Sequence, residues 1–157
     1  MALGETAPVR PRRGSRGEPP EDVEIDFVVL ADFAQAAGGK LNLIGGGWNV
    51  YRASQYPVVL PFGLGIAFLI PWSLTNRKHP WSFMIRKSEG IQLATGGGDF
   101  EIGREAGIPA GMKQRVTIGM SGQLQLLEPG AYEIIVKAGQ AEKRVTFEAV
   151  TAGQAVS

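Results

Sequence analysis

Short runs in which apolar and polar residues alternate dominate this sequence and most constrain its fold. Residues 81–87 (WSFMIRK) and 143–149 (KRVTFEA) show the pattern, with every second side chain apolar. Successive side chains of a β-strand point to opposite faces, so a period of two predicts half-buried strands. Further strands are predicted over residues 24–32, 40–44, 62–70, 115–121 and 131–137.

Turn-forming residues separate these runs at short intervals. The 22 glycines among 157 residues disfavour helices, and only residues 32–38 (DFAQAAG) are expected to hold a helical turn. The fold class predicted is all-β: an antiparallel β-sandwich of seven to nine strands, immunoglobulin-like in general architecture. Tyr132, soon after Pro129-Gly130, is either a tyrosine corner or an ordinary core tyrosine. The glycine clusters 45–47 and 96–98 are interpreted as turns or bulges.

One predicted strand, residues 62–70, has an unusually bare face. Its bulky side chains alternate with Gly63, Gly65 and Ala67. Small residues on a strand let another backbone or an aromatic ring approach closely. Trp48 and Trp72 are candidate rings, from the same chain or from a second copy. The alternatives are close internal packing and a groove for a ligand.

The ends of the sequence differ from its centre. Residues 1–22 are rich in Arg, Pro and Gly and are expected to be a disordered tail, as are residues 151–157, leaving a β-sandwich domain over 23–150. The start lacks the apolar stretch of a signal peptide. The longest apolar run, 58–70, is interrupted by Pro61 and is too short to span a bilayer as a helix. A cytoplasmic protein without membrane contact is expected.

Composition excludes several kinds of chemistry. The absence of cysteine rules out disulfides, thiolate nucleophiles and cysteine metal sites, and the single histidine rules out two-histidine sites within one chain. A formal net charge of +1 gives no field to attract nucleic acid. No nucleophile elbow and no phosphate-binding lysine motif is present. We therefore expect no catalytic residue, metal or cofactor, and no nucleic-acid partner.

The segment IPWSLTNRKHPW, residues 70–81, is the remaining candidate site. Prolines bound it, and its short polar side chains favour turns. Arg77 is a residue type that grips carboxylates or phosphates, and His79 is the type that titrates near neutral pH. The segment is interpreted first as a stabilised turn, then as a binding surface, and last as a catalytic site.

Three stretches resemble an uncharacterised family of small single-domain bacterial proteins: residues 26–48 with GGGW, 60–79 with PW and TNRKH, and 127–139 with PGAY. The resemblance implies a compact β-sandwich and assigns no activity. It draws attention to a set of possible ligand- or partner-binding residues, without roles: Trp48, Trp72, Asn76, Arg77 and His79. Asn49 stands where an acidic residue is expected after the GGGW turn.

Two functions follow as hypotheses. The first is a non-catalytic β-sandwich module that acts by protein–protein interaction or self-association, because tryptophan and arginine anchor interfaces. The alternative is a small-molecule binder or enzyme with a site around Trp72, Asn76, Arg77 and His79.

Overall fold

The structure, a computed structural model, describes residues 20–153. This range contains ten β-strands, one short 3-10 helix and no α-helix, which confirms the predicted all-β class. The elements are β1 (Glu24–Ala31), β2 (Phe33–Ala37), β3 (Lys40–Ile44), β4 (Val50–Ala53), β5 (Val58–Ile70), η1 (Trp72–Leu74), β6 (His79–Lys87), β7 (Gln92–Phe100), β8 (Gln114–Leu126), β9 (Gly130–Ala138) and β10 (Ala141–Thr151).

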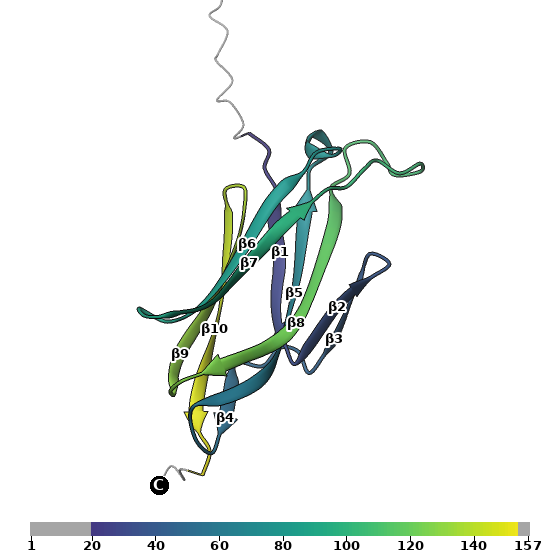
Figure 1. The fold of residues 1–157 in the computed structure, drawn as a ribbon. Coiled ribbons are helices and arrows are strands. Elements are labelled where there is room, and N and C mark those ends of the chain that lie inside the picture. The colour runs from purple at the N-terminus through teal and green to yellow at the C-terminus, as the bar shows by residue number, and fades with distance from the viewer. Residues whose placement is uncertain (1–19, 154–157) are drawn as a thin grey trace, which may run out of the picture.

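Two sheets form the layers of the sandwich (Figure 1). One sheet has the strand order β1-β5-β8, and the other has the order β4-β10-β9-β6-β7. Strands β2 and β3 form a separate two-stranded hairpin. Neighbouring strands run antiparallel except β4 and β10, which are parallel. The described residues thus hold ten strands, against the seven to nine predicted.

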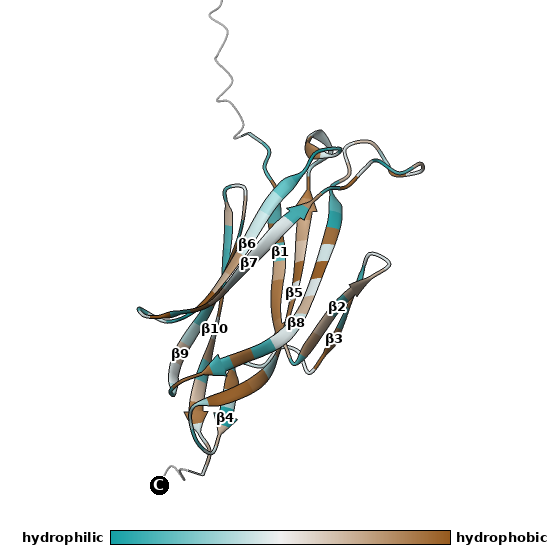
Figure 2. Ribbon diagram, viewed as in Figure 1, coloured by the Kyte–Doolittle hydropathy of each residue, from teal (hydrophilic) through white to brown (hydrophobic). Residues whose placement is uncertain are grey.

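The hydrophobic core lies between the two sheets and is centred on β5. Alternate β5 side chains, including Leu64, Ile66 and Phe68, are fully buried and belong to one cluster with Ile134 and Val136 of β9. Burying one such side chain contributes about 1.5–3 kcal/mol. Figure 2 shows the apolar residues as brown segments concentrated along β5.

The hairpin of β9 and β10 forms as the sequence predicts. Gly139 takes the positive φ of 56° that its tight turn requires. The Tyr132 hydroxyl donates a hydrogen bond to the Glu128 carbonyl at 2.5 Å, and its ring stacks on Phe147 at 5.3 Å. This bond back to nearby backbone is the tyrosine-corner contact that the sequence left as one of two alternatives.

The bare face of β5 is covered by the β2–β3 hairpin. A Cβ added at Gly63 would lie 2.6 Å from the Phe33 carbonyl carbon, and one added at Gly119 of β8 would lie 2.5 Å from the Gln35 carbonyl carbon. The backbone of β2 therefore touches the glycines directly. This is the close internal packing predicted as one alternative, and a backbone covers Gly63 and Gly119 rather than the candidate rings of Trp48 or Trp72.

A serine fixes the hairpin to the sheet. The Ser121 hydroxyl donates to the Ala34 carbonyl at 2.7 Å and accepts from the Ala34 amide at 2.8 Å. The predicted helical turn at residues 32–38 is therefore wrong, because five of these residues form β2. Pairing with β3 and the Ser121 contact outweigh the weak helical preference of alanines.

The interpretation of residues 96–98 as a turn or bulge is also wrong, because all three glycines lie inside β7 and pair with β6 in continuous register. Gly96 pairs with Phe83 and Gly98 pairs with Trp81. A Cβ at Gly96 would lie 2.4 Å from the Phe83 ring. The small residues leave room for aromatic rings that reach across from β6, a pairing known to stabilise glycines in strands.

The predicted tails fall mostly outside the described residues. The predicted N-terminal tail spans residues 1–22, of which the structure does not describe 1–19. The predicted C-terminal tail spans residues 151–157, of which it does not describe 154–157. The Asp22 carboxylate accepts hydrogen bonds from the Val23 amide at 2.8 Å and the Gln140 amide at 2.7 Å, and Thr151 ends β10. Ordered contacts therefore continue on both sides of the predicted 23–150 domain.

None of the helical structure in residues 20–153 has the length and hydropathy needed to cross a bilayer.

Candidate functional site

The segment of residues 70–81 forms a structured connection between β5 and β6. Strand β5 ends at Ile70 before Pro71, and η1 follows with a Leu74 amide that donates to the Pro71 carbonyl at 2.9 Å. Asn76 adopts a left-handed conformation with φ of 62°, and its amide donates to the Ile102 carbonyl at 2.8 Å. Asparagine tolerates this conformation better than most residues, which explains why it occurs here.

Trp72 is held by Arg104, a residue that the sequence did not single out. The Arg104 guanidinium carbon lies 4.4 Å from the Trp72 ring centroid. Its Nε donates to the Thr75 hydroxyl and its Nη2 donates to the Trp72 carbonyl, both at 2.7 Å. Arg104 thus closes the turn over Trp72. Nothing local could have revealed it, because it lies 32 residues further along the chain.

The other residues of the segment have different partners. The His79 Nε2 lies 2.7 Å from the Leu74 carbonyl oxygen, and its ring lies 5.5 Å from the Phe100 ring. Within residues 20–153, the one hydrogen bond of the Arg77 side chain is a 3.5 Å contact with the Ser73 carbonyl. The histidine ring is therefore within hydrogen-bond distance of a backbone carbonyl in the same connection between β5 and β6. These contacts match the turn interpretation.

Trp48 lies elsewhere and does not join the other four predicted residues. Its ring packs edge-on against Phe147 at 5.5 Å and lies 6.3 Å from Tyr51, over the end of the core. The indole nitrogen is buried without a hydrogen-bond partner, as is the Thr117 hydroxyl; these are the two such side-chain atoms in residues 20–153.

A concave site lies instead on the outer face of the five-stranded sheet. Because alternate β6 and β9 residues fill the core, the residues between them face outward. They pair across the strands as Ser82 with Lys137, Met84 with Ile135, and Arg86 with Glu133. Thr95 of β7 and Arg144 of β10 extend the row through Met84 and Ile135. All of these residues except Glu133 line a pocket of about 350 Å³.

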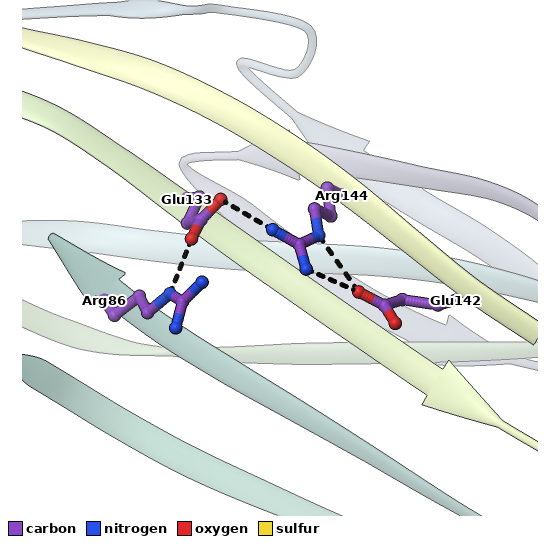
Figure 3. A network of polar contacts seen from close by, with 4 residues as sticks. All are labelled: Arg86, Glu133, Glu142 and Arg144. Atoms are coloured by element: carbon purple, nitrogen blue, oxygen red, sulfur yellow. Dashed lines mark hydrogen bonds and ion pairs between the residues drawn. The ribbon is translucent and has the colours of Figure 1, made fainter. Parts of the chain in front are cut away.

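Glu133 organises the charges of this face. The residue is only 8% exposed, although it lies on the side of the sheet away from the core. Its Oε1 accepts from Arg86 Nε at 2.5 Å, and its Oε2 lies 3.5 Å from Arg144 Nη1 (Figure 3). Arg144 also approaches Glu142 Oε1 at 2.9 Å. A buried carboxylate is costly unless it is paired, and two guanidinium groups supply the pairing.

The sequence predicted the sheet face on which several of these residues lie, but not that they lie close together. The alternation correctly predicted that Ser82, Met84 and Arg86 share one face and that Arg144 lies on a polar face. It did not predict that β9 lies between β6 and β10. Arg86 and Glu133 are 47 residues apart, so only strand order brings them together.

Two further properties bear on possible chemistry: the pKa values of titratable side chains and the grouping of possible metal ligands. Burial raises the pKa of Tyr56, whose hydroxyl donates to the Val150 carbonyl at 2.8 Å, so this side chain keeps its proton at neutral pH. Among the residues from 20 to 153, no three His, Asp or Glu side chains are grouped to hold a metal ion.

Fold and surface together define a two-layer β-sandwich with an attached hairpin and a polar concavity on its larger sheet. The chain belongs to a family of unknown function, DUF6941, whose model matches residues 26–149. The resemblance to an uncharacterised family is thereby confirmed. No curated protein matches the chain.

Proposed function

We propose that the protein is a non-catalytic binding module that associates with a second copy of itself through β3. The observation that carries this proposal is the unpaired edge of the β2–β3 hairpin. Strand β3 pairs with β2 alone among the described strands, whereas the backbone of β2 is also bound by Ser121. An open strand edge presents a row of amide and carbonyl groups that another strand can pair with.

The composition of β3 favours pairing with an identical strand. Antiparallel pairing centred on Asn42 would place Lys40 opposite Ile44 of the second copy. Lys40 is the only charged residue of β2 and β3. The two Lys40 side chains would then be about 13 Å apart, four residue steps along the strand, where salt screens most of their repulsion.

The outer face of the hairpin gives a second reason. Phe33 and Ile44 form a directly opposed pair on this face, and their exposed fractions are 40% and 65%. In the paired arrangement the aliphatic part of Lys40 from the second copy would cover Ile44, as long charged side chains commonly cover apolar surface. A two-fold axis through Asn42 would make both halves of the contact identical.

Charge placement tests this arrangement. Ile44→Lys would set two lysines directly opposite one another, which destabilises a strand pair. We expect it to convert the dimer to monomer in sedimentation equilibrium. Adding Lys40→Glu to Ile44→Lys would place opposite charges in the same register, and we expect the dimer to return.

The control is Ile91→Lys, which changes an apolar residue that is 68% exposed between β6 and β7. We expect it to leave the dimer intact. A native protein that sediments as a monomer at all concentrations would refute the proposal. Failure of the double variant to restore the dimer would refute the register.

We also propose that the sandwich is immunoglobulin-like in its connectivity. The support is the strand order: β10-β9-β6-β7 faces β1-β5-β8, as the G-F-C side faces the A-B-E side in such domains. The tyrosine corner at Tyr132 falls on β9, the strand that would correspond to F. An experimental structure with a different connectivity would refute this assignment.

A further inference from the structure

We propose that the concavity on the outer face of the five-stranded sheet binds a small organic monocarboxylate. The site is separate from the β3 edge, so it stands or falls independently of self-association. Its lining combines an apolar floor with cationic groups on either side of that floor, and each part is fixed by neighbouring strands.

The cationic part is oriented in advance. Arg86 uses Nε for Glu133, and its two terminal nitrogens have no partner among the described residues (Figure 3). Lys137, opposite Ser82 on the next strand, is exposed and forms no ion pair within residues 20–153. A guanidinium already held by one carboxylate can donate to a second one with little further loss of side-chain freedom.

The charge balance favours a single negative charge. The face carries three cations, Arg86, Lys137 and Arg144, and two carboxylates, Glu133 and Glu142, so one positive charge is left over. A carboxylate neutralises this surplus. A phosphate group carries more negative charge than the site balances.

The floor of the site is apolar. Met84 and Ile135 pair across β6 and β9 between the row of Arg86 and the row of Lys137. A volume of about 350 Å³ lies at the lower end of the range for small-molecule sites. The ligand is therefore a short acid whose carboxylate contacts Lys137, beside Ser82, and whose hydrocarbon part covers Met84 and Ile135 in the direction of Arg86.

Hexanoate is a suitable probe, titrated into the full chain with amide chemical shifts as the readout. We expect saturable shifts at Ser82, Ile135 and Lys137, with a Kd on the order of 1 mM or below. Hexanamide, which has the same length without the charge, is expected to bind at least about tenfold more weakly. Acetate is expected to bind more weakly than hexanoate, by up to about fourfold for each buried methylene that it lacks.

Lys137→Gln supplies the matched variant, because this exposed side chain is not needed for folding. We expect it to weaken hexanoate binding about tenfold. Lys113→Gln, whose lysine pairs with Glu24 away from the site, should leave binding unchanged. The proposal is overturned if hexanoate shifts no amides of this face, or if Lys137→Gln binds it as tightly as the native chain. A short acidic peptide that binds more tightly than hexanoate would overturn the assignment to a small acid.

Discussion

At the scale of single residues, the neighbours of a polar side chain decide its role more than its own chemistry does. His79 is a residue type with catalytic potential, yet it lies against the Leu74 carbonyl within a turn. Glu133 is an unremarkable position in the alternating pattern, yet it joins two arginines from two different strands. The buried glutamate therefore organises a charged surface, whereas the histidine lies in the turn that was the first interpretation of its segment.

Replacement of Glu133 tests this organising role. Glu133→Gln removes the charge that pairs with Arg86 and Arg144, and we expect it to lower the free energy of unfolding by about 1–2 kcal/mol. Both arginines are partly exposed, so solvent screens their attraction to Glu133 and limits the loss. Glu142→Gln, at a more exposed carboxylate that pairs with Arg144 and with no other described cation, should cost less than about 0.5 kcal/mol. Urea unfolding measures both; equal losses would contradict the special role of Glu133.

At the scale of elements, the β2–β3 hairpin depends on glycines in other strands. Gly63 and Gly119 let the β2 backbone approach closer than any side chain would allow. The Ser121 hydroxyl then satisfies the amide and carbonyl of Ala34, which would otherwise lack partners at that edge. The hairpin is therefore attached to the sandwich by backbone contact at Gly63 and Gly119, and the Leu41 and Leu43 side chains pack over Gly65 beside it.

An alanine at one of these glycines should displace the hairpin. A Cβ on Gly119 would overlap the Gln35 backbone, so we expect Gly119→Ala to lower the free energy of unfolding by about 1–3 kcal/mol. Gly122 is the matched control, because it lies on the same strand and a Cβ there would meet nothing within 4 Å. Gly122→Ala should stay within about 0.5 kcal/mol of the native chain. Similar losses in both variants would show that the close approach is unimportant.

Strands were predictable where their signal is local. Residues 40–44 are predicted and observed as one strand because alternation and the Gly38-Gly39 turn act within a few residues. Strand β5 begins earlier than predicted, at Val58, and passes through Pro61. Its pairing with β1 stops at Gly63, so Pro61 pairs with β8 alone among the described strands, and its missing amide costs less. A sequence pattern does not reveal such an edge.

At the scale of the whole molecule, strand order and surface concavity were beyond prediction. The cation over Trp72 and the carboxylate beside Arg86 both come from distant parts of the chain. The sequence shows the residue types at the candidate site. Their alignment into cross-strand rows depends on β9 lying between β6 and β10, which the sequence does not show. Exposure likewise depends on the assembled sheets, which is why Phe33 and Ile44 were not identified as a surface pair.

The proposed self-association also predicts an effect of protein concentration on stability. Where the dimer is populated, unfolding releases two chains, so a tenfold rise in protein concentration should stabilise the dimer by about 1.4 kcal/mol. We expect the urea midpoint to rise with concentration for the native chain and to stay fixed for Ile44→Lys. A midpoint for the native chain that does not depend on concentration would contradict association through the hairpin.

The parallel pair of β4 and β10 sets an order of events during synthesis. Among the strands of residues 20–153, β4 pairs with β10 alone, and β10 is the last of them to be made. Residues 50–53 must therefore wait for about a hundred further residues to leave the ribosome before they gain backbone partners. The five-stranded sheet is completed late, and until then its edge strand remains available to other chains.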